Sequence, residues 1–405
     1  VWLSNNFTNT GMTMNTYRVY SPTDLSLILN PNGQQANAEK LSAGNQTINV
    51  FDKDFKFSQN LRFNLGFDFE LGGIDWTAEA IYSKTLNDIM YQNLAYDTNG
   101  KKLGDVITGM DFDQRPMFSM VSGANAYTGI YSLSNTSKGY SYSLSLKGEK
   151  KFAFGLDVMA SYTYTQSKSI NCGTSSVAES NWMYNYTHGD SNHPELGYSA
   201  FNVPHRINVS VFYQKDLGKN RTTTVGLIYT GNSGSPYSIY YYGDLNGDGS
   251  NGNDLIFIPT DDQIDRMPFL ANARYTVDQQ RANMKAWIAA DDYLSKHRGE
   301  YYDRYADNET FEHHFDFHLA EQFRFKVGQE THALEVSFDI MNIGNMFNKK
   351  WGRYTSTGAA VYYSPITYNA SSQQFQFLHD ADYNMRSYSD YYSRWRAQIG
   401  LKYTF

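Results

Sequence analysis

Residues 61–84 contain the strictest pattern in the chain, two eleven-residue runs in which apolar and polar side chains alternate. In residues 61–71 every odd position is apolar, and every even position is polar or glycine. After Gly72 and Gly73 the alternation resumes, with Ile81 as its single exception. Successive side chains of a β-strand point to opposite faces, so each run predicts a strand with one apolar and one polar face. A tilted membrane strand needs about 9–11 such residues, whereas a half-exposed soluble sheet alternates in the same way.

The same alternation recurs along the chain, and the arrangement of the alternating runs distinguishes a membrane barrel from a soluble sheet. It predicts strands at 61–71, 74–84, 139–148, 152–166, 206–214, 222–231, 311–325, 333–342 and 391–405. Short turns are expected at 72–73, 149–151, 215–221 and 326–332, and long loops at about 85–138, 167–205, 232–310 and 343–390. Regular alternation of short turns with long loops is typical of an outer-membrane barrel, with the long loops outside the cell. We therefore predict an all-β, transmembrane antiparallel β-barrel.

Composition excludes several other classes. The net charge of −7 over 405 residues argues against an electrostatic nucleic-acid binder. The longest apolar runs fall short of the 18 or so residues of a membrane-spanning helix. Cys172 is the single cysteine, which excludes an internal disulfide and a cysteine metal cluster.

An odd number of strands predicts that the barrel continues beyond this chain. Bacterial single-chain barrels have even strand counts, and an open sheet edge in lipid costs several kcal/mol for each unpaired backbone group. We therefore expect the missing strands upstream of Val1. On this basis residues 1–60 are expected to form an extracellular loop segment, and residues 61–405 the C-terminal part of the barrel.

Several segments resemble the C-terminal part of a TonB-dependent outer-membrane receptor, specifically the Oar-like group of Bacteroidetes. The most specific are "DDYLSKHRGEYYDR" (291–304) and "FDIMNIGNMFNKKWGR" (338–353), because barrel physics alone does not require them. The other matching segments are 49–71, 80–94, 134–152, 205–214 and 244–259. The closing "RAQIGLKYTF" resembles the C-terminal barrel-assembly signal, carried here by Leu401, Tyr403 and Phe405.

The resemblance implies a 22-stranded barrel around an N-terminal plug, of which this chain would supply about the last nine strands, beginning with strand 14. It implies uptake of a solute across the outer membrane, with TonB acting through an upstream plug and with lipid around the wall. A surface lipoprotein is a further candidate partner. The alternative is a scaffolding barrel within an outer-membrane complex. The residues show no catalytic grouping at motif spacing, so we expect no enzyme activity.

The sequence "DLNGDG" at 244–249 matches the first half of a calcium loop. Oxygens at its first, third and fifth positions converge on a hard cation, and a glycine allows the sharp turn. Two hypotheses remain open: a Ca²⁺ site, or a glycine-rich turn capped by its own side chains. The candidate ligands are Asp244, Asn246, Asp248 and Asp254, the last one position before the place of the usual acid.

Residues 277–298 are predicted to form a helix inside the longest loop. Thr276 and Gln279 match a capping box, and Gly299 is the expected end of the helix. Trp287, Ile288 and Leu294 are expected on one face, either as a lid or partner platform or as a packing surface for the loop.

Polar residues of the alternating strands are expected to line the lumen. Arginines there either guide anionic solutes or pair with a plug and with lumen acids. His314, Asp316 and His318 share one face, where they bind a transition metal or only hydrogen-bond. The predicted lumen residues are Arg62, Asp68, Glu70, Arg206, His318, Arg324, Arg394 and Arg396.

Tyrosine-rich segments lie in the predicted outer loops and suit two roles. Exposed rings recognise glycans or peptides, whereas buried rings pack large loops against each other. The segments are "TYRVYSP" (16–22), "NWMYNY" (181–186), "YSIYYYG" (237–243) and "YSDYYSRW" (388–395).

Overall fold

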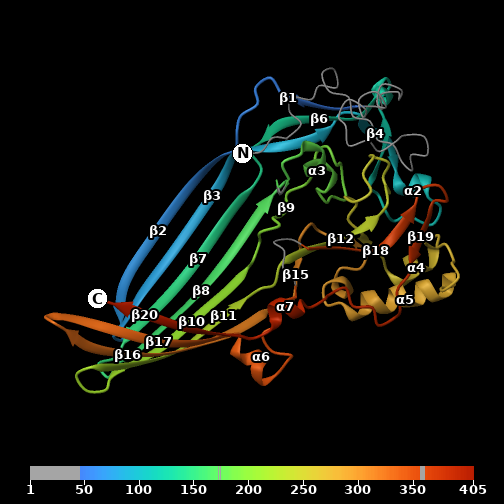
Figure 1. Ribbon diagram of the computed structural model, residues 1–405. Coiled ribbons are helices and arrows are strands. Elements are labelled where there is room, and N and C mark those ends of the chain that lie inside the picture. Colours follow the sequence, from blue (N-terminus) through green and yellow to red (C-terminus); the bar gives the residue numbers. More distant parts are fainter. Residues whose placement is uncertain (1–45, 172, 174, 356–360) are drawn as a thin grey trace, which may run out of the picture.

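The computed structural model describes residues 46–171, 173, 175–355 and 361–405. Its main feature is a wall of long antiparallel strands that lie side by side in chain order (Figure 1). These strands are β2 (Gln59–Leu71), β3 (Ile74–Asn93), β7 (Tyr140–Lys151), β8 (Leu156–Ser169), β10 (His205–Asp216), β11 (Arg221–Asn232), β16 (Glu312–Val327), β17 (Glu330–Met341) and β20 (Arg396–Thr404). Each predicted strand overlaps one of them.

Side chains form alternating rows across the wall, because neighbouring strands keep an unbroken register over five strands. One apolar row consists of Tyr213, Val225, Leu319, Phe338 and Ile399. The row beside it consists of Gln214, Thr224, Ala320, Ser337 and Gly400. In the apolar row, Leu319 is 38% and Ile399 is 76% exposed. One face of the wall is therefore apolar and uncovered, as the alternation predicted.

Phe212 is an exception to the alternation, and its strand neighbour accounts for it. Phe212 lies on the polar face opposite Gly226, where its ring covers the glycine. A Cβ added to Gly226 would lie 2.4 Å from Phe212 Cε1. The missing side chain of Gly226 therefore makes room for the ring.

Several predicted strand ends were wrong. β7 continues through Lys151, so the turn lies at 152–155 instead of 149–151. Gly155 has a φ of +95°, and a Cβ there would lie 2.1 Å from the Gln214 carbonyl oxygen, so the turn requires glycine. β3 runs to Asn93, well past the predicted end at 84. Residues 391–395 precede the last strand instead of belonging to it.

The wall has two different ends (Figure 1). Its short turns gather at one end, which we call the turn end, and its long connections at the other, which we call the loop end. β2 and β20 are not paired with each other within the described residues. The total number of strands in the barrel therefore stays a prediction.

The described residues of the long connections are folded, and together they form the loop assembly (the described residues of 94–139, 170–204, 233–311 and 342–395). A four-stranded sheet in the order β15-β12-β18-β19 lies at its centre. The strands here are β4 (Tyr96–Lys102), β5 (Pro116–Met120), β6 (Tyr127–Thr136), β9 (Gly197–Tyr198), β12 (Pro236–Tyr242), β13 (Phe257–Ile258), β14 (Glu300–Tyr301), β15 (Asp307–Asn308), β18 (Val361–Asn369) and β19 (Gln374–Phe377). β1 (Gln46–Phe51) pairs in parallel with β6, so this end of the predicted first loop contains a strand.

The helices of the loop assembly are short. They are α2 (Leu103–Val106), η1 (Ala124–Ala126), α3 (Ala178–Met183), α4 (Asp261–Arg266), α5 (Val277–Ala290), η2 (Leu294–Lys296), α6 (Ile343–Phe347) and α7 (Asp390–Ser393). In the described part of the chain, none of the helices has the length and hydropathy needed to cross a membrane.

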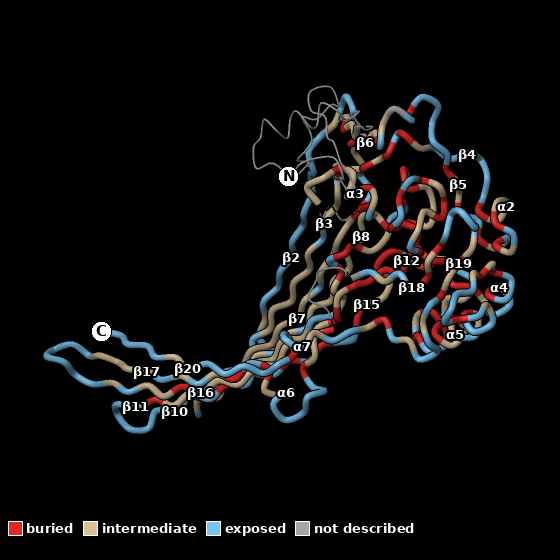
Figure 2. The backbone as a smooth tube through the Cα atoms, turned by 45° about the vertical axis from the view of Figure 1, so that its right-hand side comes forward, coloured by how far each residue is buried: buried red, intermediate tan, exposed pale blue. Residues whose placement is uncertain are grey.

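The hydrophobic core of the molecule lies in the loop assembly and not in the wall. Buried residues gather there, while the wall is mostly intermediate or exposed (Figure 2). Each of the four long connections contributes to one cluster, for example Met110, Tyr186, Trp287 and Phe375. The loops therefore hold one another through buried apolar contacts.

α5 confirms the predicted start of the helix and corrects its end. The Thr276 hydroxyl accepts a hydrogen bond from the Gln279 amide at 3.2 Å, as the capping box requires. The helix ends at Ala290, because the Asp291 carboxylate accepts the amides of Tyr293 and Leu294 and begins a new turn. The prediction that Gly299 ends this helix was wrong.

Candidate functional site

The predicted calcium loop lies deep in the loop assembly, between three of its long connections. Asp248 and Asp254 are buried there, and the guanidinium of Arg115 reaches Asp113 at 2.9 Å and Asp254 at 3.2 Å. Arg115 also donates to the Leu255 carbonyl at 2.9 Å. We call Asp113, Arg115, Asp244, Asp248 and Asp254 the acidic hub.

The turn at 244–254 is tied by its own side chains. The two carboxylate oxygens of Asp244 accept the amides of Gly247 at 2.8 Å and Gly249 at 3.0 Å. Asp248 accepts the Ser250 amide and the Asn253 side-chain amide, both at 2.8 Å. The bond from the Ser250 amide to Asp248 and the bond from the Asp248 amide to Asn246 each span two residues and are Asx turns, as expected in a glycine-rich turn that its own side chains cap.

Negative charge is in excess at the acidic hub. Burial raises the pKa of Asp254 to about 8. The positive charge of Arg115 lowers this pKa, whereas the negative charges of Asp248 and Asp244 raise it further. Burial, with repulsion from Asp248, also raises the pKa of Asp244 to about 6. Arg115 is therefore the main compensating charge of this buried group.

The observed hydrogen bonds fit the hypothesis of a self-capped turn better than the hypothesis of a Ca²⁺ site. Arg115 already lies against Asp254, and both oxygens of Asp244 are hydrogen-bonded. Within the described residues, no three His, Cys, Asp or Glu side chains are grouped so that they could hold a metal ion. The calcium hypothesis stays a prediction.

Calorimetry separates the two hypotheses for this turn. If it is self-capped, Asp248→Ala removes the acceptor of the hydrogen bonds from Asn246, Ser250 and Asn253 and lowers the stability of the loop assembly by about 1–3 kcal/mol. Ca²⁺ then gives the same heat with and without the substitution. A heat of Ca²⁺ binding that disappears in Asp248→Ala would instead establish the calcium loop. Asp278→Ala, an exposed acid on α5, is the matched control.

A second, partly buried charge group joins the last long connection to the others. Arg386 lies 3.4 Å from a carboxylate oxygen of Glu309 and 3.6 Å from one of Asp307, and it donates to the Tyr237 hydroxyl at 3.1 Å. Neither Arg115 nor Arg386 could be identified from the sequence, because their partners are distant in the sequence and no motif marks them. Both arginines stabilise the arrangement of the loops.

The predicted lumen residues lie on the polar face, with corrections. Asp68 accepts the Thr77 hydroxyl at 2.7 Å, and Arg324 pairs with Asp216 at 3.1 Å instead of with one of the expected acids. Arg396 donates to the Tyr391 carbonyl at 3.1 Å. Arg394 follows α7 and is not in a strand. Arg62, Glu70 and Arg206 keep the predicted alternation in β2 and β10.

His314, Asp316 and His318 share a strand face but contact different partners. His318 Nδ1 lies 2.6 Å from Asp339, and Asp316 accepts the Asn342 amide at 2.7 Å. His314 is stacked on Tyr354 with ring centroids 4.0 Å apart. The contacts of His318 and Asp316 fit the hydrogen-bonding alternative, whereas both ring nitrogens of His314 are buried without a hydrogen-bond partner among the described residues.

Burial divides the tyrosine-rich segments. Trp182, Tyr186, Tyr237 and Tyr241 are buried, so their segments pack the loops. The segment at 388–395 is different, because its aromatic side chains are all more than 40% exposed. The segment at 16–22 lies outside the described residues. Trp287 and Ile288 are also buried, which fits a packing role for α5. Leu294 is buried too, but it lies in η2 and not on the same helix as predicted.

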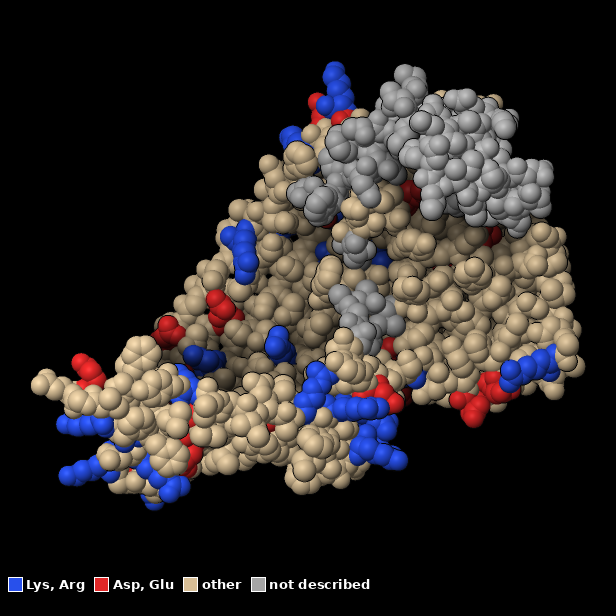
Figure 3. Space-filling model, viewed as in Figure 1, with Lys and Arg blue, Asp and Glu red and all other residues tan. Residues whose placement is uncertain are grey.

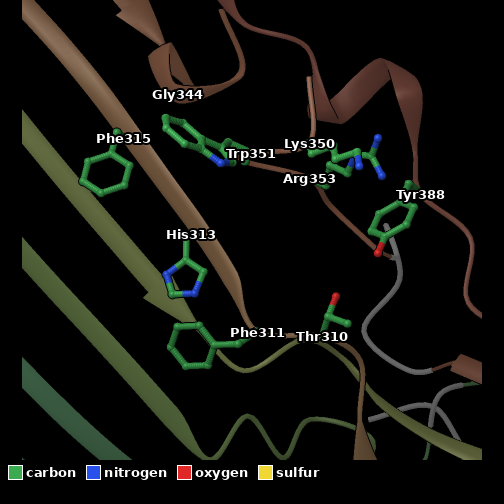
Figure 4. A pocket seen from close by; sticks show the side chains of 10 residues that line it. Thr310, Phe311, His313, Phe315, Gly344, Lys350, Trp351, Arg353 and Tyr388 are labelled. Atoms are coloured by element: carbon green, nitrogen blue, oxygen red, sulfur yellow. The ribbon is translucent and has the colours of Figure 1, made fainter. Parts of the chain in front are cut away.

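A pocket of about 690 Å³ lies at the loop end of the wall, on its apolar side (Figure 4). Phe311, His313 and Phe315 form one side of it, at the start of β16. Lys350, Trp351, Arg353 and Tyr388 lie across from them. We call this the rim pocket.

A wall of alternating strands, with one uncovered apolar face and long connections at one end, is typical of part of a membrane β-barrel. A family model described as an outer membrane beta barrel domain matches residues 2–376, and the chain belongs to this family. No curated protein matches the sequence. The exposed apolar face therefore lies against the lipid of the outer membrane. Leu401 and Tyr403 are exposed on this face of β20, and Phe405 is exposed directly after the strand, at the predicted assembly signal.

Proposed function

We propose that this chain is part of a TonB-dependent receptor of the Oar-like type, which binds a solute outside the cell and imports it through a plugged barrel. The observation that carries the proposal is the loop assembly. Four connections that are distant in the sequence share one hydrophobic core, so they form a preorganised surface at the mouth of the barrel. Preorganised loops bind a ligand at a lower cost in conformational entropy than mobile ones.

The polar face of the wall suits passage of a hydrated solute. Polar side chains such as Gln322, Glu335 and Lys402 line up across neighbouring strands, whereas an apolar face would not be wetted. In this proposal, the plug, the TonB contact and the other strands belong to a complete receptor that contains this chain. The receptor catalyses no reaction. A surface lipoprotein is a proposed partner that binds at the loop assembly.

A scaffolding barrel is the second candidate, favoured by the exposed aromatic segment at 388–395. Tyr391 is 67% and Tyr392 is 51% exposed. Exposed tyrosines are enriched where proteins bind each other. In this alternative the loop assembly would hold a protein partner and transport little.

Deletion of the TonB contact in the complete receptor tests the proposal against the alternative. Under uptake, the deletion stops accumulation of the solute that co-purifies with the receptor, while the amount of barrel in the outer membrane stays constant. A scaffolding barrel would retain its partner complex and its effect on the cell after the same deletion. Undiminished accumulation without the TonB contact would refute the proposal.

A further inference from the structure

The rim pocket combines positive charge with an apolar wall, and the function proposed above uses neither. Its lining includes Lys350 and Arg353 and no acidic residue. Among the described residues, neither cation forms an ion pair with a carboxylate. A group of Lys and Arg side chains is visible in Figure 3 in the region where Figure 1 draws α6 and α7. Within the described part of the chain, the pocket therefore offers two cations that no carboxylate holds in an ion pair.

The cations are held by an ordered segment. The Asn342 side-chain amide donates to the Gly352 carbonyl at 2.7 Å and to the Ser393 carbonyl at 2.8 Å, closing the loop that follows β17. Asn345 donates to the Trp351 carbonyl at 3.0 Å. Arg353 donates to the Lys349 carbonyl at 3.1 Å, and its guanidinium lies 4.6 Å from the centre of the Tyr388 ring.

The opposite side of the pocket belongs to the lipid-facing side of β16. Phe311 and Phe315 are 37% and 40% exposed there. His313, on the same face, contacts the Tyr229 hydroxyl at 2.8 Å. Trp351 and Phe347 are 58% and 74% exposed at the same end of the wall. Aromatic side chains of this kind mark the boundary between hydrocarbon and headgroups.

The long loops of such barrels face outward, so this boundary belongs to the outer leaflet. We propose that the rim pocket binds a phosphorylated lipid of the outer leaflet, with its phosphate at Lys350 and Arg353 and its acyl chains along Phe311 and Phe315. Arginine is well suited to phosphate because its planar fork donates two parallel hydrogen bonds. The inference holds for an uptake receptor and for a scaffold alike, and does not depend on TonB.

Native mass spectrometry of the complete detergent-purified protein tests the inference. The probes are diphosphorylated lipid A, the same lipid without phosphates, and inorganic phosphate. We expect the first probe to bind, and the double variant Lys350→Gln with Arg353→Gln to bind it at least about tenfold more weakly, because each phosphate contact of a charged donor is lost. Lys219→Gln with Lys326→Gln, which removes two cations at the turn end, should bind the lipid normally.

Three outcomes would overturn the inference. They are equal binding by the double variant, equal binding of the lipid without phosphates, and full displacement by inorganic phosphate at equal concentration, which would indicate an ion site. Equal binding by the double variant would show that Lys350 and Arg353 lie near the headgroups but do not determine which lipid binds. If the double variant does not assemble, Lys350→Gln alone replaces it, since that side chain is exposed, and the charge-conserving Lys350→Arg should restore binding.

Discussion

Replacing Leu319 with arginine is expected to destabilise the complete protein in bilayers by about 2–4 kcal/mol, the cost of an arginine on a lipid-facing strand near the membrane midplane. Leu319 lies in the middle of β16 and is 38% exposed on the apolar face. Its neighbours in the row, Val225 and Phe338, are apolar too. The charge would therefore meet hydrocarbon with no polar partner. Urea-driven unfolding in phospholipid vesicles measures the change.

His318→Arg is the matched control, because it introduces the same side chain one residue earlier in the same strand. His318 points to the polar face and contacts Asp339 at 2.6 Å, so an arginine there keeps an acidic partner and meets water. We expect a change below about 1 kcal/mol. Equal losses for the two variants would contradict a lipid-facing side for Leu319.

Arg115→Leu should cost the loop assembly about 3–5 kcal/mol, the usual effect of removing one partner of a buried ion pair. Arg115 and its partners Asp113 and Asp254 are each no more than 2% exposed. The substitution leaves buried carboxylates without their compensating charge. Hydrogen exchange reports the loss locally, and the amides of Tyr241 and Leu255, which are bonded in this region, should exchange about a hundredfold faster or more.

Arg274→Leu provides the comparison for this prediction. Arg274 pairs with Asp380 at 3.0 Å, but the two side chains are 69% and 61% exposed. Solvent screens such a pair, so its loss should change the free energy of unfolding by less than about 1 kcal/mol. If the two arginine variants had equal effects, the acidic hub would not be the point at which the loops are held together.

The wall could be predicted from the sequence because its signal is local. Each strand shows its period within about ten residues, and burial of one face fixes the register. Errors arose at strand ends, where local signals compete. Phe152 and Phe154 continue the apolar phase of the following strand, yet they lie in a turn that Gly155 makes possible.

The loop assembly could not be predicted in the same way, because its contacts join residues far apart in the chain. Arg115 and Asp254 are separated by 139 residues. β12 and β18 pair in parallel although more than a hundred residues lie between them. The sequence did reveal the turn at 244–249 and the cap at Thr276, both of which depend on neighbouring residues.

The central claim is that one row of side chains in each strand lies against hydrocarbon, and spin labels along β17 test it most directly. Labels are placed one at a time at Val336, Ser337, Phe338 and Asp339 of the complete protein in bilayers, and their collisions with oxygen and with a water-soluble nickel chelate are compared. The structure predicts that labels at Val336 and Phe338 collide more with oxygen, and that labels at Ser337 and Asp339 collide more with the nickel chelate. Nickel contact at all four positions, with no period of two, would contradict it.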